Sequence, residues 1–335
     1  MATKPAATKP ATTKPATTKP ATTKPATKIA PKKSTTSKAA ATRPIGFVGI
    51  GNMGGPMVRC LAKAGFHVCI YDVNTSATEA FGTEVGTVSI APDLASLGNA
   101  CDVVITMLPN SKIVRTATIG TKAKPGFAPT LKPGAVVIDM SSSYPLDTRS
   151  LGADLGKYDV ALIDAPVSGG VPKAVSGTLA IMTGGDTHAI DRVANILSAM
   201  GTVHRTGALG SGHAMKALNN YVSSAGLIAT AEALIIGQKF GLDGAVMTSV
   251  LNASSGRNNT TENKAERYML NGAFNSGFAL ALMEKDVGMA QQLAEALQLK
   301  ASELEFVSTY LTKALKSLGP DADHTAVYAF AEKST

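Results

Sequence analysis

The stretch Gly46-Phe-Val-Gly-Ile-Gly-Asn-Met-Gly54 decides the fold of this chain. Residues 45–50 form a short apolar run that is typical of a buried strand, and Gly49, Gly51 and Gly54 make the pattern GxGxxG. Helically spaced apolar residues follow and end at Gly65, and residues 67–72 then predict a second strand. Because the glycines lie between a strand and a helix, the sequence predicts a βαβ unit.

Each glycine has a distinct task in such a unit. Gly49 permits a tight turn, Gly51 lets the backbone approach a pyrophosphate, and Gly54 allows the helix to pack closely on the strand. The helix N-terminus adds free N–H groups and the positive end of a dipole. These features predict a dinucleotide site, and a glycine turn with only a structural role is the alternative.

Asp72 ends the second predicted strand, 21 residues after Gly51. Its carboxylate can accept hydrogen bonds from both ribose hydroxyls and would repel a 2′-phosphate. No Arg or Lys follows in residues 73–79. The sequence therefore favours NAD over NADP.

Two further apolar runs, residues 102–108 and 135–140, predict strands of a parallel sheet that is covered on both faces. Loops of small or polar residues follow them, Pro109-Asn110-Ser111 and residues 141–143. Ligands bind at the carboxyl ends of such strands, so we expect both loops to face the cofactor. Ordinary turn chemistry is the alternative for each serine.

A hydroxyl beside two glycines follows the next apolar run, in Ala165-Pro-Val-Ser168-Gly169-Gly170. Backbone N–H groups without side chains around them make a small anion site, which suits a carboxylate. A structural loop is the alternative.

Residues 213–240 contain no Pro and predict one long helix of about 40 Å, with Gly241 at its end. Apolar residues lie nearly all round it, so we expect it to be buried between domains or subunits. Lys216 and Asn220 stand out, since their spacing places them on one face. A buried lysine reaches its neutral form more easily and can act as a general base for an alcohol. A lysine whose amine reaches solvent at the helix start is the alternative.

Lys285 and Asp286 lie within a second predicted helix, residues 280–297. Neighbouring helix positions do not face each other, so we expect no ion pair between them. Either Lys285 reaches a carboxylate or the cofactor and lowers the pKa of Lys216, or it belongs to a surface ion pair.

The composition fits an α/β protein: 335 residues, 44 % hydrophobic and 17 % charged, with 32 Gly. Three cysteines lack any CxxC spacing, which argues against a disulfide framework or a structural zinc and favours a reducing, cytoplasmic location. No run of 18 apolar residues predicts a membrane span. The composition excludes fibrous and disulfide-built classes, and we expect no metal and no membrane partner.

The net charge of +8 comes from the N-terminus. Residues 1–43 hold nine Lys and one Arg without any acid, which leaves 22 basic residues against 24 acidic ones in the rest of the chain. A Lys-Pro pair recurs every five residues from Lys4 to Lys24, which forbids a continuous helix and predicts a disordered tail. A solvated spacer and an arm that binds polyanions weakly are the open alternatives, since a targeting peptide fits poorly.

In combination, these segments identify the chain as similar to the β-hydroxyacid dehydrogenase family. Four signatures occur in the family's order: residues 46–54, residues 164–170 with Gly177-Thr-Leu, residues 210–220, and Lys285-Asp286. Met107-Leu-Pro109 and residues 252–257 also resemble family segments. The resemblance covers residues 44–330, everything except the tail.

The resemblance implies a doubly wound Rossmann sheet domain over 44–207, followed by an all-helical domain over 208–335 for substrate and dimer contacts. Lys216 is then the catalytic acid/base, assisted by Asn220. Substrate contacts fall to Ser168, Gly169, Gly170 and Lys285. Cofactor contacts fall to Gly49, Gly51, Asn52, Met53, Gly54, Asp72, Leu108, Pro109, Ser142, Lys285 and Asp286.

The implied activity is NAD-dependent oxidation of a small 3-hydroxy acid, such as 3-hydroxyisobutyrate, to its semialdehyde. Residues 258–263 are more polar than a branched methyl substrate suggests, so a more hydroxylated acid is an alternative if this segment lines the pocket. The rivals are a related tartronate or succinic semialdehyde reductase, a sugar-acid dehydrogenase, or a non-enzymatic cofactor-binding scaffold. The apolar helix and the apolar residues 307–318 exceed what one small domain covers, so we expect a homodimer or homotetramer.

Overall fold

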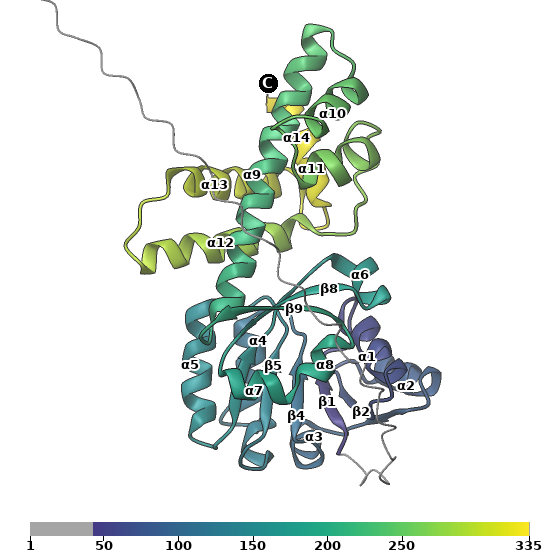
Figure 1. The fold of residues 1–335 in the computed structure, drawn as a ribbon, viewed down its shortest axis with the longest axis vertical. Helices are drawn as coiled ribbons and strands as arrows, with labels where there is room; N and C mark the ends of the chain where they lie inside the picture. The colour runs from purple at the N-terminus through teal and green to yellow at the C-terminus, as the bar shows by residue number, and fades with distance from the viewer. Residues whose placement is uncertain (1–42, 335) are drawn as a thin grey trace, which may run out of the picture. The chain divides into compact units, whose positions relative to one another are not determined.

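The computed structural model describes residues 43–334, and the tail expected over residues 1–42 lies outside them. Five parallel strands form the centre of one sheet (Figure 1), and the sequence predicts the first four of those named next, whereas the fifth, β6, is not predicted as a strand. They are β1 (Ile45–Val48), β2 (Val68–Tyr71), β4 (Val103–Thr106), β5 (Val136–Asp139) and β6 (Ala161–Asp164). The described strands are shorter than the apolar runs, because the flanking residues already turn into loops.

The sheet has nine strands in the order β3-β2-β1-β4-β5-β6-β8-β7, with β9 beside β8. The four not yet named are β3 (Val88–Ile90), β7 (Val167–Ser168), β8 (Leu179–Gly184) and β9 (Gly201–Gly207). The chain runs outward from β1 through β2 to β3 and then returns to the other side of β1, where it continues as β4, β5 and β6. A crevice outside the carboxyl ends of β1 and β4 is the usual ligand site of such a doubly wound sheet.

Helices cover both faces of this sheet, and each face has its own apolar core. Alternate residues of β1 divide between them, with Phe47 in one core and Val48 in the other. Met57 and Ile190 belong to the first core, and Leu97 and Leu151 to the second. The helices are α1 (Gly54–Lys63), α2 (Thr75–Glu84), α3 (Leu94–Ala100), α4 (Ser111–Ile119), α5 (Pro145–Gly156), α6 (Gly170–Ser176), α7 (Thr187–Arg192) and α8 (Ala194–Ser198), with a 3₁₀ turn at Ala128–Thr130.

The remaining residues form a helical part built around the long helix α9 (Ser211–Phe240), which ends at Gly241 as predicted. Its partners are α10 (Gly244–Asn252), α11 (Asn259–Asn263), α12 (Leu280–Ala296), α13 (Ser302–Leu318) and α14 (Val327–Ser334), with a π turn at Ala265–Met269 and a 3₁₀ turn at His324–Ala326. Leu227, Leu234 and Val287 lie at the centre of its core. No helix within residues 43–334 is long and apolar enough to cross a membrane.

Two expectations concern apolar surface. Met215, Val222, Ile236 and Phe240 on α9 are exposed in the single chain, so burial of α9 between subunits stays a prediction. The expectation that residues 307–318 exceed what one domain covers is wrong, because the apolar side of α13 is covered within the chain, with Val307 and Leu311 fully buried.

Candidate active site

The glycine loop after β1 has the geometry that the sequence predicts. Gly49 has a φ of +96°, and a Cβ there would lie 2.4 Å from the Met107 carbonyl oxygen. A Cβ on Gly54 would lie 1.9 Å from the Gly49 carbonyl oxygen, so only glycine lets α1 begin so close to the strand. At Gly51 a Cβ would meet no atom within 4 Å. The loop therefore leaves open space where a pyrophosphate would approach the backbone, and this fits a dinucleotide.

The start of α1 leaves donors for such a ligand. Met53 precedes the helix, and no side chain caps its first N–H groups. Asn52 is exposed beside it. Asp72 lies at the end of β2, where its carboxylate accepts hydrogen bonds from the Ile50 N–H and the Asn74 N–H, both at 2.9 Å. Asp72 is thereby fixed beside the glycine loop, at the position from which a ribose would be bound.

The loops after β4 and β5 meet at the same edge of the sheet. The Leu108 N–H donates to Ser141 Oγ at 2.9 Å, and Ser143 Oγ donates to Asp139 Oδ2 at 2.7 Å. Within the described residues the Ser142 hydroxyl, by contrast, has no hydrogen bond to another residue. Of the three serines, Ser142 is thus the one whose hydroxyl stays available to a ligand.

Lys285 joins the helical part to these two loops. Its Nζ donates to the Pro109 carbonyl at 3.0 Å and to the Ser142 carbonyl at 3.2 Å. Its Nζ also lies 3.4 Å from Asp286 Oδ1. The expectation that these neighbours form no ion pair is wrong, because the long, flexible Lys285 side chain brings its amine back to the Asp286 carboxylate.

Lys216 lies on α9, half-buried, facing α12. Burial lowers the pKa of Lys216, the nearby Asp286 carboxylate opposes this, and the positive charge of Lys285 lowers it further. Neither a hydrogen bond nor an ion pair ties its amine to another residue of 43–334. The side chain therefore has the two properties of a general base, a destabilised ammonium and a free nitrogen.

Asn220, one turn further along α9, is buried and donates through Nδ2 to Asp286 Oδ2 at 2.6 Å. Asp286 is only 2 % exposed, and its other oxygen accepts no hydrogen bond. The structure thus groups Lys216, Asn220, Lys285 and Asp286 at one place, although they come from two helices far apart in the sequence.

Ser168 ends β7, and Gly169 and Gly170 lead from it into α6. This turn lies at the carboxyl edge of the parallel strands, since β6 and β7 both run antiparallel to β8. Gly169 and Gly170 have φ values of +130° and +65° and are exposed. Within residues 43–334, no hydrogen bond or ion pair joins this turn to Lys216, so its role as the carboxylate site remains a prediction.

Sequence reasoning missed how α9 is attached to the sheet. Asp164 at the end of β6 accepts hydrogen bonds from the Gly210 N–H at 2.7 Å and the His213 N–H at 2.8 Å. A Cβ on Gly212 would lie 2.2 Å from the Met182 carbonyl oxygen, so glycine is needed for this approach. The sequence signal for this attachment is the Gly210-Ser-Gly212 stretch at the start of a long helix, together with Asp164 at the end of a strand.

The polar segment 258–263 has a structural task in this chain. The Asn258 side chain caps α11 through the Thr260 N–H and donates to Thr230 Oγ1 on α9 at 3.1 Å. Thr260 and Thr261 are buried. Whether residues 258–263 also line the substrate pocket stays a prediction.

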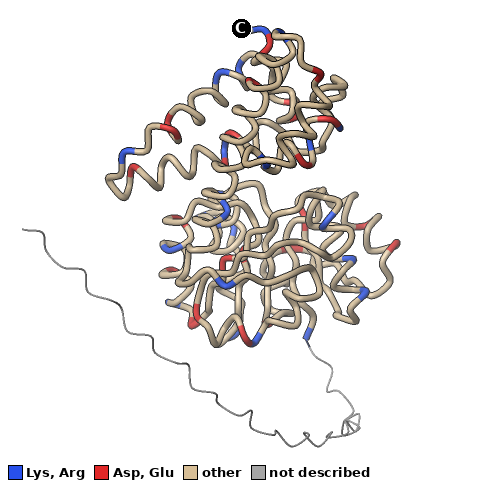
Figure 2. Tube along the Cα trace, turned by 45° about the horizontal axis from the view of Figure 1, so that its top comes forward, with Lys and Arg blue, Asp and Glu red and all other residues tan. Residues whose placement is uncertain are grey.

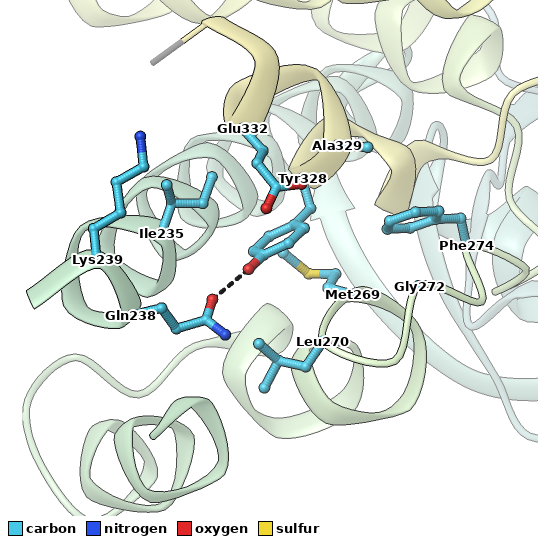
Figure 3. Close-up of a pocket in the computed structure, with 10 residues that line it drawn as sticks. All are labelled: Ile235, Gln238, Lys239, Met269, Leu270, Gly272, Phe274, Tyr328, Ala329 and Glu332. Carbon is cyan, nitrogen blue, oxygen red and sulfur yellow. Dashed lines mark hydrogen bonds between the residues drawn. The ribbon is translucent and has the colours of Figure 1, made fainter. Parts of the chain in front are cut away.

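One cavity of about 490 Å³ lies away from these residues, between the far end of α9, the π turn and α14 (Figure 3). Tyr328 donates to Gln238 Oε1 within it, and Met269 and Phe274 supply apolar walls. It contains none of the predicted site residues. Among the described residues, no cluster of His, Cys, Asp and Glu could hold a metal ion.

Comparisons with known proteins define the family to which this chain belongs. Residues 44–210 match the family model for the NAD binding domain of 6-phosphogluconate dehydrogenase, and residues 210–331 match that for the NAD-binding domain of NADP-dependent 3-hydroxyisobutyrate dehydrogenase. The chain is 36 % identical over 275 residues to the mitochondrial 3-hydroxyisobutyrate dehydrogenase of Bos taurus, covering 79 % of this chain and 80 % of the relative. It is 35 % identical over 250 residues to 2-(hydroxymethyl)glutarate dehydrogenase of Eubacterium barkeri, covering 73 % and 80 %.

A solved structure of the Mycobacterium tuberculosis 3-hydroxyisobutyrate dehydrogenase with L-serine superposes with a TM-score of 0.79. Its sequence is 30 % identical, and the match covers 86 % of this chain and 99 % of that one. This chain therefore belongs to the β-hydroxyacid dehydrogenase family of NAD-binding oxidoreductases. Within that family, its relatives include the 3-hydroxyisobutyrate dehydrogenases.

Proposed function

We propose that this protein oxidises a small 3-hydroxy acid to the corresponding semialdehyde with NAD, and that Lys216 is the general acid/base. The observation that carries the proposal is the half-buried amine of Lys216, without a partner among residues 43–334, beside Asn220, Lys285 and Asp286. Lys285 in turn reaches the loops at the cofactor edge of the sheet. An acid/base group is thereby held next to the place where a nicotinamide would lie.

Bound NAD would supply the hydride acceptor. The turn at Ser168, Gly169 and Gly170 would hold the substrate carboxylate and so orient the alcohol carbon. Neutral Lys216 would take the hydroxyl proton on Nζ as the C–H bond breaks, and its ammonium would return a proton to the oxygen in the reverse direction. Asn220, fixed by Asp286, would orient the same hydroxyl.

The relatives support a particular substrate class. The names 3-hydroxyisobutyrate, 2-(hydroxymethyl)glutarate and L-serine all describe a carboxylate with a CH₂OH group on its α-carbon. They differ in the second substituent on that carbon, which is a methyl, a carboxyethyl or an ammonium group. We propose the shared part as the minimal substrate, and the second substituent as the point that distinguishes the individual acid.

The preference for NAD over NADP is also a proposal, and it rests on Asp72. The oligomeric state and the cytoplasmic location stay predictions, and mitochondrial relatives exist. A reductase of the same family, acting on tartronate or succinic semialdehyde, would use the same residues in the reverse direction. The non-enzymatic alternative is a cofactor-binding scaffold with a polyanion-binding tail.

The test is NADH formation at 340 nm with NAD or NADP and a panel of acids: 3-hydroxyisobutyrate, L-serine, glycerate, threonate and 4-hydroxybutyrate. We expect turnover with NAD, and a loss of about 10²- to 10⁴-fold in kcat for Lys216→Ala with NADH binding retained. Deleting residues 1–42 should leave turnover unchanged. Measurable NADH binding without turnover of any acid would favour the scaffold.

A further inference from the structure

His213 lies in the first turn of α9, three residues before Lys216, and its side chain is fully buried. The imidazole lies between two buried carboxylates: Nε2 is 3.7 Å from Asp139 Oδ2, and Nδ1 is 3.8 Å from Asp164 Oδ2. Asp139 and Asp164 are register partners on β5 and β6. The ring is therefore inserted at the carboxyl edge of the sheet, where the cofactor loops begin.

Both ring nitrogens have hydrogen-bond partners on other elements. Nε2 lies 3.0 Å from the Ser141 carbonyl oxygen, and Nδ1 lies 2.8 Å from Thr148 Oγ1 on α5. A carbonyl oxygen only accepts, so Nε2 carries a proton and donates it to this bond. The single proton of the Thr148 hydroxyl can be donated to Nδ1 or to the Tyr144 carbonyl oxygen, which lies 3.1 Å away. One side chain of α9 is thus bonded to the loop after β5 and to the first turn of α5.

We propose that His213 is a positioning residue, whose imidazole fixes the first turn of α9 to the Ser141 loop and thereby sets the position of the Lys216 amine at the cofactor edge. The inference rests on the role of Lys216 proposed above. His213 itself is not proposed to touch the substrate or the cofactor.

The geometry explains why the His213 side chain is needed, in addition to the backbone hydrogen bonds, to fix the orientation of α9. The Gly210 and His213 N–H groups bind one carboxylate, that of Asp164, at the very end of the helix. Bonds at the end of a helix hold it lengthwise but resist rotation about its axis poorly. The imidazole projects sideways from the helix, so its two bonds oppose that rotation.

Lys216 is one turn further along the same rigid helix, about 4.5 Å along the axis. Any rotation at His213 is therefore passed on to the lysine. A misplacement of about 1 Å in a reacting group can cost about 10²-fold in rate. The Ser141 carbonyl is also adjacent to Ser142, whose own carbonyl accepts from Lys285. The two hydrogen bonds of the His213 imidazole therefore also fix α9 relative to the loop that Lys285 contacts.

The test compares His213→Ala, His213→Gln and the control His204→Ala, whose imidazole is exposed on β9. A cavity of about 260 Å³ between α4 and α5 is lined by Asp139, Ser143 and Thr148, so water can reach the groups that the alanine variant leaves unpaired. Thermal unfolding identifies which variants fold. The readouts are kcat and KM for the best acid, and the Kd of NADH from its fluorescence.

We expect His213→Ala to lower kcat by about 10- to 100-fold while the Kd of NADH changes by less than about threefold, since the glycine loop and Asp72 are untouched. His213→Gln should keep kcat within about fivefold of the parent, because a primary amide can donate to Ser141 and accept from Thr148. His204→Ala should match the parent. A parent-like kcat in His213→Ala overturns the proposal, as does an equal kcat loss in the folded glutamine variant.

Amide hydrogen exchange separates this proposal from the proposed function. We expect residues 213–218 to exchange several-fold faster in His213→Ala than in the parent and the glutamine variant, with residues 228–238 of the same helix unchanged. If the parent turns over no acid, the proposed function fails. This exchange pattern alone then decides whether His213 fixes the first turn of α9. Equal exchange at 213–218 in all variants would contradict it.

Discussion

Lys216 illustrates how burial and two neighbouring charges act on a single amine. Burial is the largest influence and favours the neutral form, whereas Asp286 favours the ammonium and Lys285 opposes it. Because Asp286 and Lys285 are adjacent in sequence and pair with each other, the charge near Lys216 is nearly balanced. In the proposed mechanism, the neutral form of Lys216 would therefore come chiefly from desolvation.

Two substitutions should move the pH dependence of this lysine in opposite directions. Lys285→Met removes a charge that lowers the pKa of Lys216, so the rise of oxidation rate with pH should shift to higher pH. Asp286→Asn removes a charge that raises it and keeps an acceptor for Asn220, so the rise should shift to lower pH. Profiles of kcat against pH in the oxidation direction measure both shifts. Shifts of the same sign would show that Lys216 is not the titrating group.

At the scale of elements, two of the three glycines in α9, Gly212 and Gly226, lie in different surroundings. A Cβ on Gly212 would clash with the Met182 carbonyl, whereas on Gly226 it would meet the Asn258 side chain at an ordinary 3.5 Å. Gly212→Ala should destabilise the protein by about 1–3 kcal/mol through overpacking. Gly226→Ala should stabilise it by about 0.5–1 kcal/mol, because a helix interior favours alanine. Denaturant unfolding of both variants checks the opposite signs.

Lys264, between α11 and the π turn, is a second lysine held largely out of water. Burial lowers its pKa to about 8, although Asp323 opposes the shift. Between pH 8 and the ordinary lysine pKa the unfolded chain binds more protons, so this residue makes stability rise with pH across that window. Lys264→Met should be more stable than the parent at pH 7, by about 3 kcal/mol at most. Its advantage should shrink from pH 8 to 10.5, and an advantage independent of pH would exclude this explanation.

The sequence predicts best the elements that depend on residues close together in the chain. The β1-turn-α1-β2 unit, the central strands, α9 and α12 follow from apolar period, glycine spacing and the absence of proline. Strands β7 to β9 are not predicted: β7 has only two residues, and β9 is largely polar and exposed along its length. The Asn220–Asp286 bond joins residues 66 positions apart, so it depends on how α9 packs on α12 and could not be derived from spacing.

At the scale of the whole molecule, the described residues expose more large apolar side chains than the single-chain core explains. Ile236, Phe240, Leu242, Val246 and Val250 lie at the end of α9 and on α10, each more than half exposed. Basic and acidic residues are interspersed over residues 43–334 (Figure 2), so no uniform charge there opposes association of copies. This surface supports the homodimer or homotetramer that the sequence predicts.

Light scattering at micromolar concentration tests this prediction. The parent should have the mass of a dimer or tetramer, and Phe240→Glu should shift it toward a lower mass, because a charge would then be buried in the contact. Phe306→Glu on α13 is a matched substitution outside the α9–α10 surface, where we expect a smaller effect. A monomeric parent would refute the prediction of oligomers.

The anchoring of α9 on Asp164 also limits how this protein can be dissected. The two family models meet at residue 210, which suggests a natural cut between two modules. A fragment that ended there would leave the Asp164 carboxylate, 0 % exposed in the intact chain, without the His213 N–H that it accepts from. The complementary fragment would begin with a helix deprived of its terminal anion. Gene fusions, domain exchanges and split reporters built on this chain should therefore carry the sheet and the first turns of α9 together.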